Sequence, residues 1–176
     1  MDTLALSAKA QPIRFLALDV DGVLTDGAVI YDNSGEELKA FNIKDGLGIK
    51  LAQRAGIEVA IITGRQSMLL ERRAQELGIT TLIQGREDKL AVLRDLLDER
   101  ELSPEQAAYM GDDLPDLAAI MSVAVGACPS DATAEVLQAA DWVSHKPGGS
   151  GAVRELIEML LIAQGRWDGL IERFRP

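Results

Sequence analysis

Short apolar runs alternate with amphipathic stretches of helical period along most of this chain. The runs are too short for helices and hold few polar residues, as is typical of strands buried on both faces of a sheet. Strands that alternate with helices predict a parallel sheet with helices on both faces, which is an α/β, Rossmann-like fold. The expected strands are residues 13–18, 57–62, 79–83, 107–110, 123–127 and, at the edge of the sheet, 141–144.

The stretches between these strands carry helix signals at their ends. Ser67 is a favourable N-terminal cap, and Gly56 and Gly78 stand where helices are expected to stop. Ser103 and Pro104 are typical of a short, capped helical turn. The expected helices cover residues 46–55, 67–77, 114–122, 133–140 and 152–164, with a further amphipathic helix that contains Asp88 and Lys89.

Residues 28–41 are predicted to form a β-hairpin. Two strand-like halves flank Asp32-Asn33-Ser34-Gly35, a sequence with strong turn chemistry. Because the hairpin directly follows the first strand, it would project like a flap over the end of that strand. An isolated hairpin is only marginally stable, so it needs something to pack against. That surface is either the sheet of its own chain or a second copy of the protein.

Length and composition fit a single globular domain over residues 1–176, with a loose N-terminal arm (1–11) and a C-terminal tail (165–176). Hydrophobic residues make up 47% of the chain but aromatic residues only 4%, so the core must be aliphatic. The net charge of −10 argues against nucleic acid as a partner, because its phosphates demand a basic surface.

The chain is expected to be cytoplasmic and to make no membrane contact. No apolar run approaches the ~18 residues that a membrane span requires. The first dozen residues lack the basic start and long apolar segment of a secretory signal. The lone Cys128 cannot form an internal disulfide, which is compatible with a reducing compartment.

Polar side chains follow the central strands at the point where each strand ends. Asp19 and Asp21 come after the first strand, Thr63 after the second, and Asp112 after the fourth, while Lys89 is expected one turn into its helix. The carboxyl ends of parallel strands meet at one edge of a sheet, where such folds bind ligands. These side chains are therefore expected to share one site.

Several carboxylates, one hydroxyl and one lysine suit phosphoryl transfer. Carboxylate oxygens are the ligands that Mg²⁺ prefers. A threonine hydroxyl and a lysine ammonium can hold phosphate oxygens, and an aspartate can attack phosphorus to form an aspartyl phosphate. No GxxxxGK[ST] or GxGxxG sequence follows any strand, so a nucleotide site has no support.

The motifs DVDGVLTDG, TGR, QGREDK and GDDLPD, in this order, resemble those of the haloacid dehalogenase superfamily. The resemblance covers nearly the whole chain. It implies that Asp19 is the nucleophile and that Asp21 is the general acid and base. It also implies that Asp19, Asp112 and the backbone carbonyl of Asp21 bind Mg²⁺, with Asp113 and Asp116 supporting the metal. Thr63 and Lys89 would then hold the phosphoryl oxygens.

Only the hairpin and one short helix lie between the first two core strands, which leaves no room for an inserted cap domain. The chain is therefore similar to the capless subgroup of the superfamily. This subgroup includes enzymes of lipopolysaccharide precursor synthesis that hydrolyse 3-deoxy-D-manno-octulosonate 8-phosphate, and relatives that act on nonulosonate 9-phosphates. The resemblance implies a small phosphorylated sugar acid as the substrate and a homotetramer in which a neighbouring subunit covers each active site.

The residues expected to contact this substrate lie where the resemblance places them, in the further motif FNIKDGLGIK (41–50) and at the basic residues Arg65, Arg73 and Arg86. Two of them depart from the pattern of many relatives, because Lys44 stands where Arg is expected and Asn42 where His is expected. The predicted substrate-binding residues are Asp21, Asn42, Lys44, Asp45, Gly46, Gly64, Arg65, Arg73, Arg86 and Lys89.

An alternative from another class is a phosphoacceptor signalling domain of the receiver type, which also gathers acids, a hydroxyl and a lysine at one rim. Receivers carry two adjacent acids on the first strand and the phosphorylated aspartate on a later one. Here Asp21 lies two residues after Asp19, which favours hydrolysis. Sustained release of phosphate from a phosphate ester would distinguish the enzyme from a receiver, which is labelled once.

Overall fold

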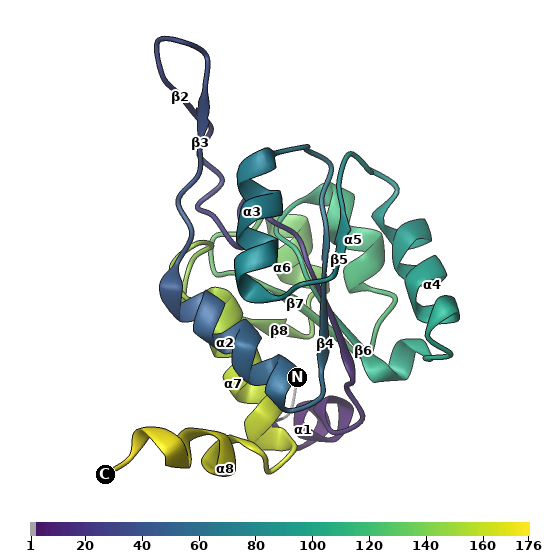
Figure 1. Ribbon diagram of the computed structural model, residues 1–176. Coiled ribbons are helices and arrows are strands. Elements are labelled where there is room, and N and C mark those ends of the chain that lie inside the picture. The colour runs from purple at the N-terminus through teal and green to yellow at the C-terminus, as the bar shows by residue number, and fades with distance from the viewer. Residues whose placement is uncertain (1–2) are drawn as a thin grey trace.

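The fold is a six-stranded parallel sheet with helices on both faces, as the sequence predicts. It is seen in a computed structural model that describes residues 3–176 (Figure 1). The strand order is β5-β4-β1-β6-β7-β8, with β8 at an edge, also as predicted. The strands are β1 (Phe15–Leu18), β4 (Glu58–Ile62), β5 (Thr81–Ile83), β6 (Ala107–Met110), β7 (Val125–Cys128) and β8 (Trp142–Val143).

Strand β1 lies in the middle of the sheet, where it pairs with β4 on one side and β6 on the other. Its side chains alternate between two apolar cores. Leu16 and Leu18 belong to one core, and Phe15 and Ala17 to the other, and all four are fully buried. Burial on both faces explains why this strand reads as an almost unbroken apolar run.

Each core is closed by its own layer of helices (Figure 1). The first core packs under α1 (Thr3–Ala10), α2 (Ile43–Arg54), α3 (Met68–Leu77) and α7 (Ala152–Ala163). The second packs under α4 (Lys89–Glu99), α5 (Leu114–Ile120) and α6 (Ala134–Ala139), and a 3₁₀ turn (Pro104–Gln106) precedes β6. Within residues 3–176, no helix combines the length and the hydropathy that a membrane crossing needs.

The prediction of a loose N-terminal arm is wrong for residues 3–11, while residues 1–2 lie outside the described part of the chain. Helix α1 packs against the first core through Leu6 and the fully buried Ala10. Lys9 Nζ lies 2.8 Å from a carboxylate oxygen of Asp141, and Gln164 Nε2 donates to the Ala10 carbonyl oxygen. These partners come from distant parts of the chain, so the local sequence gave no sign of them.

The C-terminal tail, residues 165–176, is also structured. It contains helix α8 (Trp167–Ile171) and a 3₁₀ turn (Glu172–Phe174). The guanidinium of Arg154 lies 5.1 Å from the centre of the Trp167 ring, which holds the start of the tail against α7.

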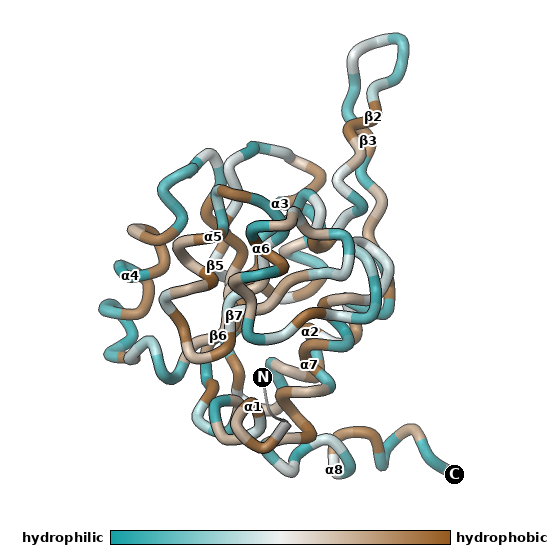
Figure 2. Tube along the Cα trace, turned by 180° about the vertical axis from the view of Figure 1, so that it is seen from behind, coloured by the Kyte–Doolittle hydropathy of each residue, from teal (hydrophilic) through white to brown (hydrophobic). Residues whose placement is uncertain are grey.

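The predicted hairpin is present and stands away from the domain (Figure 1). Its strands β2 (Ile30–Tyr31) and β3 (Glu37–Leu38) form a separate antiparallel sheet, so the hairpin does not pair with the sheet of its own chain. The Asp32 carboxylate accepts hydrogen bonds from the turn amides of Ser34 and Glu36. The apolar strands carry a polar tip (Figure 2), and the side chains of Val29, Ile30, Tyr31 and Leu38 are 47–60% exposed.

Candidate active site

The predicted polar residues meet at the carboxyl edge of the sheet, beside β1 and β6. The backbone N–H of Asp19 donates to the Met110 carbonyl oxygen over 3.0 Å, which joins the ends of these two strands. The chain leaves β1 toward β4 and returns on the other side as β6, and such a switch point opens a crevice. A cavity of about 420 Å³ lies here, lined by Asp19, Asp21, Gly27, Thr63, Gly64, Arg65, Glu87, Lys89, Asp112, Asp113, Pro115 and Asp116.

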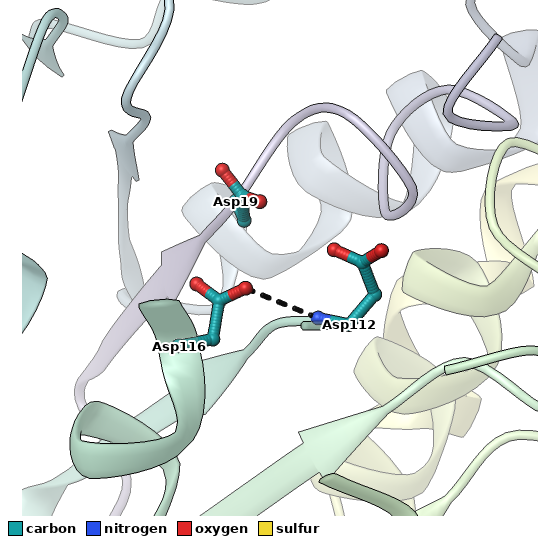
Figure 3. Close-up of side chains that lie close together, drawn as sticks. All are labelled: Asp19, Asp112 and Asp116. Atoms are coloured by element: carbon teal, nitrogen blue, oxygen red, sulfur yellow. Dashed lines mark hydrogen bonds between the residues drawn. The ribbon is translucent and has the colours of Figure 1, made fainter. Parts of the chain in front are cut away.

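Three carboxylates converge in this cavity (Figure 3). Asp19, Asp112 and Asp116 each place one oxygen so that all three oxygens lie within 4.8 Å of one another. Asp19 is 6% exposed and Asp116 is 1% exposed. Asp116 Oδ2 accepts from the backbone N–H of Asp112 over 3.2 Å, and Oδ1 accepts from the Tyr109 hydroxyl over 2.7 Å. Hydrogen bonding therefore fixes Asp116 in its buried position.

A single lysine faces these acids. Lys89 Nζ lies 3.0 Å from Asp19 Oδ1 and 2.7 Å from Asp116 Oδ1, and the lysine is 4% exposed. Lys89 is the first residue of α4, slightly earlier in the helix than the predicted position one turn inside it. Burial lowers the pKa of Lys89, but the two aspartates raise it by more, so the lysine remains a cation.

One cation does not balance the three acids. Burial raises the pKa of Asp19 to about 7, and repulsion by Asp116 adds to this effect although Lys89 opposes it. Burial also raises the pKa of Asp112 to about 7, with repulsion from Asp19 and Asp116. Such pKa values indicate a site that lacks positive charge.

The residues of this cluster fit Mg²⁺. They offer only oxygen ligands, which hard cations prefer to nitrogen or sulfur. Only glycine fits at position 22 beside these carboxylates, because a Cβ atom there would lie 2.0 Å from Asp112 Oδ2 and would clash with it. Gly22 also has a φ of +89°, a conformation that favours glycine. The turn after β1 thus brings its backbone against the Asp112 carboxylate.

Asp21 points toward the base of the hairpin. Its carboxylate pairs with Lys39, and Arg65 Nε lies 3.6 Å from its other oxygen. Arg65 also pairs with Glu37 over 2.6 Å. Lys39 and Glu37 were not among the predicted site residues, because only the path of the hairpin brings them to Asp21 and no motif marks them.

Seven predicted site residues line the cavity, and six predicted substrate contacts do not. Thr63 is buried in its wall, and Gly64 and Arg65 also line it. Arg86 instead pairs with Asp88, and the Arg73 guanidinium lies 5.9 Å from the centre of the Phe41 ring. The six residues outside the cavity wall are Asn42, Lys44, Asp45, Gly46, Arg73 and Arg86.

No family model matches the chain, but individual relatives do. The 3-deoxy-D-manno-octulosonate 8-phosphate phosphatase KdsC of Escherichia coli is 50% identical over 161 residues, which cover 92% of this chain and 86% of the relative. Identity at this level over almost the whole chain shows a common family.

Solved structures agree with the sequence comparison. The 3-deoxy-D-manno-octulosonate 8-phosphate phosphatase of Moraxella catarrhalis, in complex with magnesium, phosphate and KDO, has a TM-score of 0.95 and 43% identity, with 97% of this chain and 98% of that chain covered. A Legionella pneumophila structure assigned to subfamily III A of the haloacid dehalogenase (HAD) superfamily has a TM-score of 0.94 and 44% identity, with coverage of 97% and 94%. The receiver-type alternative is thereby set aside. The chain belongs to the family of 3-deoxy-D-manno-octulosonate 8-phosphate phosphatases, in the haloacid dehalogenase superfamily.

Proposed function

We propose that this protein is a Mg²⁺-dependent phosphatase that hydrolyses 3-deoxy-D-manno-octulosonate 8-phosphate to the free sugar acid and phosphate. The observation that carries the proposal is the buried cluster of Asp19, Asp112, Asp116 and Lys89 at the carboxyl edge of the sheet. The substrate follows from family membership and from the ligands of the Moraxella catarrhalis relative.

The reaction proceeds in two displacements at phosphorus. A carboxylate oxygen of Asp19 attacks the phosphorus atom, the bond to the sugar oxygen breaks, and Asp21 gives a proton to the leaving alkoxide. Water then attacks the aspartyl phosphate and gives a proton to Asp21, while the bond between phosphorus and the Asp19 oxygen breaks. Both residues line the same cavity, which supports these roles.

The other residues bind and orient the phosphoryl group. Thr63 donates a hydrogen bond to a phosphoryl oxygen, and Lys89 places a positive charge beside it. Bound Mg²⁺, held by Asp19, Asp112 and the backbone carbonyl of Asp21, would neutralise negative charge on the phosphoryl group. Asp116 would support the site rather than bind the metal, because each of its oxygens already accepts two hydrogen bonds, Oδ1 from Lys89 and Tyr109 and Oδ2 from two backbone N–H groups.

A comparison of two phosphorylated sugar acids tests this proposal. With Mg²⁺, phosphate release should show a higher kcat/KM for 3-deoxy-D-manno-octulosonate 8-phosphate than for a nonulosonate 9-phosphate. Activity should be lost in excess EDTA and return when Mg²⁺ is added. A higher kcat/KM for the nine-carbon substrate would replace the assigned substrate, and full activity after proven metal removal would refute the metal requirement.

We also propose that the protein is a homotetramer in which the hairpins pack together and a neighbouring subunit covers each site. The hairpin carries exposed apolar side chains on strands that pair with no other strand within residues 3–176, and a capless site lacks its own cover. A neighbouring subunit would also supply substrate contacts that the cavity of one chain does not contain.

Charge on the hairpin strands should dissociate this tetramer. Val29→Asp or Ile30→Asp should shift the light-scattering mass toward the 19.0 kDa of one chain, and activity should fall although the cavity residues are unchanged. Asn33→Asp, which adds the same charge at the polar tip, is the matched control and should remain a tetramer. A wild-type protein that is monomeric and fully active at high dilution would contradict the proposal.

We infer that this activity belongs to the cytoplasm. The supporting observation is Cys128, a buried free thiol, because free thiols persist in reducing compartments.

A further inference from the structure

Asp45 is a buried acid of helix α2 that the proposed chemistry does not use. It is 1% exposed and lies outside the cavity wall. Asp45 Oδ1 accepts a hydrogen bond from the backbone N–H of Arg154 over 2.8 Å, and the backbone N–H of Gly151 acts on this carboxyl to lower its pKa, against the larger effect of burial. Both amides lie at the N-terminus of the 12-residue helix α7, whose dipole favours a negative charge. Asp45 therefore fixes the point at which α7 begins.

The segment just before α7, which we call the glycine loop (residues 147–151), is pressed against the turn after β1. The backbone N–H of Gly149 donates to the Val23 carbonyl oxygen over 2.9 Å. A Cβ atom at Gly148 would lie 1.9 Å from the Gly22 carbonyl oxygen, and one at Gly149 would lie 2.6 Å from the Thr25 carbonyl carbon. The two backbones are thus in direct contact, with no side chain between them.

The turn after β1, which we call the acid loop (residues 20–26), carries Asp21. On one side, the carbonyl group of Gly22 contacts the glycine loop. On the other side, the Cα atom of Gly22 faces Asp112, because a Cβ atom at this position would lie 2.0 Å from Asp112 Oδ2. The acid loop is therefore held between the glycine loop and a carboxylate of the metal cluster. A shift of the glycine loop toward the acid loop would therefore press on Gly22 and, through it, on the Asp112 carboxylate.

The glycine loop has two further anchors. Asn42 Nδ2 donates to the Gly149 carbonyl oxygen over 3.2 Å, and the backbone N–H of Gly148 donates to Asp131 Oδ1 over 2.9 Å. Asp45 differs from both because it is buried, and its second oxygen, Oδ2, has no hydrogen-bond partner among residues 3–176. Burial raises the pKa of this carboxyl. A buried carboxyl group with one unpaired oxygen is unfavourable for stability, which indicates that the hydrogen bond of Asp45 to the start of α7 serves the active site.

We propose that Asp45 is a positioning residue of the active site: by holding the start of α7 it presses the glycine loop onto the acid loop and so sets the placement of Asp21 and Asp112. This inference rests on the proposed function, in which Asp21 transfers the proton. It gives Asp45 a role different from the substrate contact that the motif suggested.

The test compares Asp45→Ala with Asp45→Asn. Asp45→Ala removes both acceptors and should lower kcat about 10- to 100-fold while KM changes less than about threefold, because misplacement of reacting groups costs rate more than binding. Mg²⁺ should bind more weakly, as measured by calorimetry. Asp45→Asn keeps one oxygen acceptor and should retain most of the wild-type kcat. A substrate-contact role predicts the reverse pattern, with a raised KM and an almost unchanged kcat.

A second substrate separates positioning from a loss of folded protein. An activated aryl ester, p-nitrophenyl phosphate, has a leaving group that needs no proton, so its first step depends less on Asp21. In Asp45→Ala, kcat/KM should fall at least about threefold more for the sugar phosphate than for the aryl ester. An equal fall for both would mean that Asp45 is merely structural. Wild-type protein that cleaves the aryl ester but not the sugar phosphate would refute the proposed substrate and leave the Mg²⁺ affinity as the test of positioning.

Two more variants test the same proposal if Asp45→Ala does not fold. Asp131→Ala removes an exposed anchor of the same glycine loop and should lower kcat in the same direction, by about two- to tenfold. Asp141→Ala is the matched control and should leave kcat unchanged, since Asp141 bonds to the backbone N–H of Gly126 and to Lys9, which belong to neither loop. An unchanged kcat in Asp131→Ala, or an equal loss in Asp141→Ala, would overturn the proposal.

Discussion

Asp19→Asn is expected to lower kcat by more than about a thousandfold while the protein stays folded. The amide keeps the shape of the side chain but has no anionic oxygen to attack phosphorus. Folding should not suffer, because burial, together with repulsion by Asp116, raises the pKa of this carboxyl to about 7. Above that pH the ionised acid costs stability in the metal-free protein, and the neutral amide removes this cost. Phosphate release and thermal unfolding, measured at pH 8 without metal, check both statements.

The control for this prediction is Asp26→Asn, which makes the same change at an exposed position of the same turn and should leave kcat unchanged. Turnover by Asp19→Asn within about tenfold of the wild type would contradict the covalent scheme. A collapse of folding in Asp19→Asn would instead contradict the electrostatic description of the cluster.

Lys89→Met should affect both activity and stability. Removing one partner of a buried ion pair leaves uncompensated charge and typically costs about 3–5 kcal/mol of unfolding free energy. Here the variant leaves Asp19 and Asp116 without the ammonium that lies 3.0 and 2.7 Å from them. The loss of a positive charge beside the phosphoryl group should also lower kcat about 100-fold or more. Denaturant unfolding and phosphate release are the measurements.

The loss of stability in Lys89→Met should depend on pH, and the direction of this dependence can be predicted. The folded-state pKa values of Asp19 and Asp112 are raised to about 7, so their ionised forms are penalised as pH rises toward and beyond 7. Without Lys89 the penalty grows, so the metal-free variant should be least stable above pH 7 and should recover as pH falls to 5. Lys50→Met, at an exposed position of α2, is the control. A stability loss that stays the same from pH 5 to pH 8 would contradict this account.

Much of the site could be predicted because its parts are local. Asp19, Thr63 and Asp112 each follow a strand whose apolar run is visible in the sequence, and a parallel sheet brings strand ends to one edge. The strand boundaries shifted by one or two residues, for example from 57–62 to Glu58–Ile62, because apolar residues outside the ladder are also buried.

The rest depends on contacts between distant segments. Lys39 meets Asp21 only through the path of the hairpin, and Asp45 meets the start of α7 across more than a hundred residues. Asp116 was predicted as a support for the metal, but its closeness to Lys89 requires α4 and α5 to lie side by side. Periodicity and motif spacing describe one element at a time, so they cannot reveal such pairs.

The central position of β1 in the sheet also determines when the protein can first become active during its synthesis. Phe15 pairs with Glu58 and with Ala107, so the strand that bears Asp19 cannot be enclosed until both partners have left the ribosome. The glycine loop and α7, which complete the enclosure, come later still. Chains released early would carry exposed apolar strands and scattered acids, and would have no partial activity. The order of the strands therefore makes catalysis a property of the nearly complete chain alone.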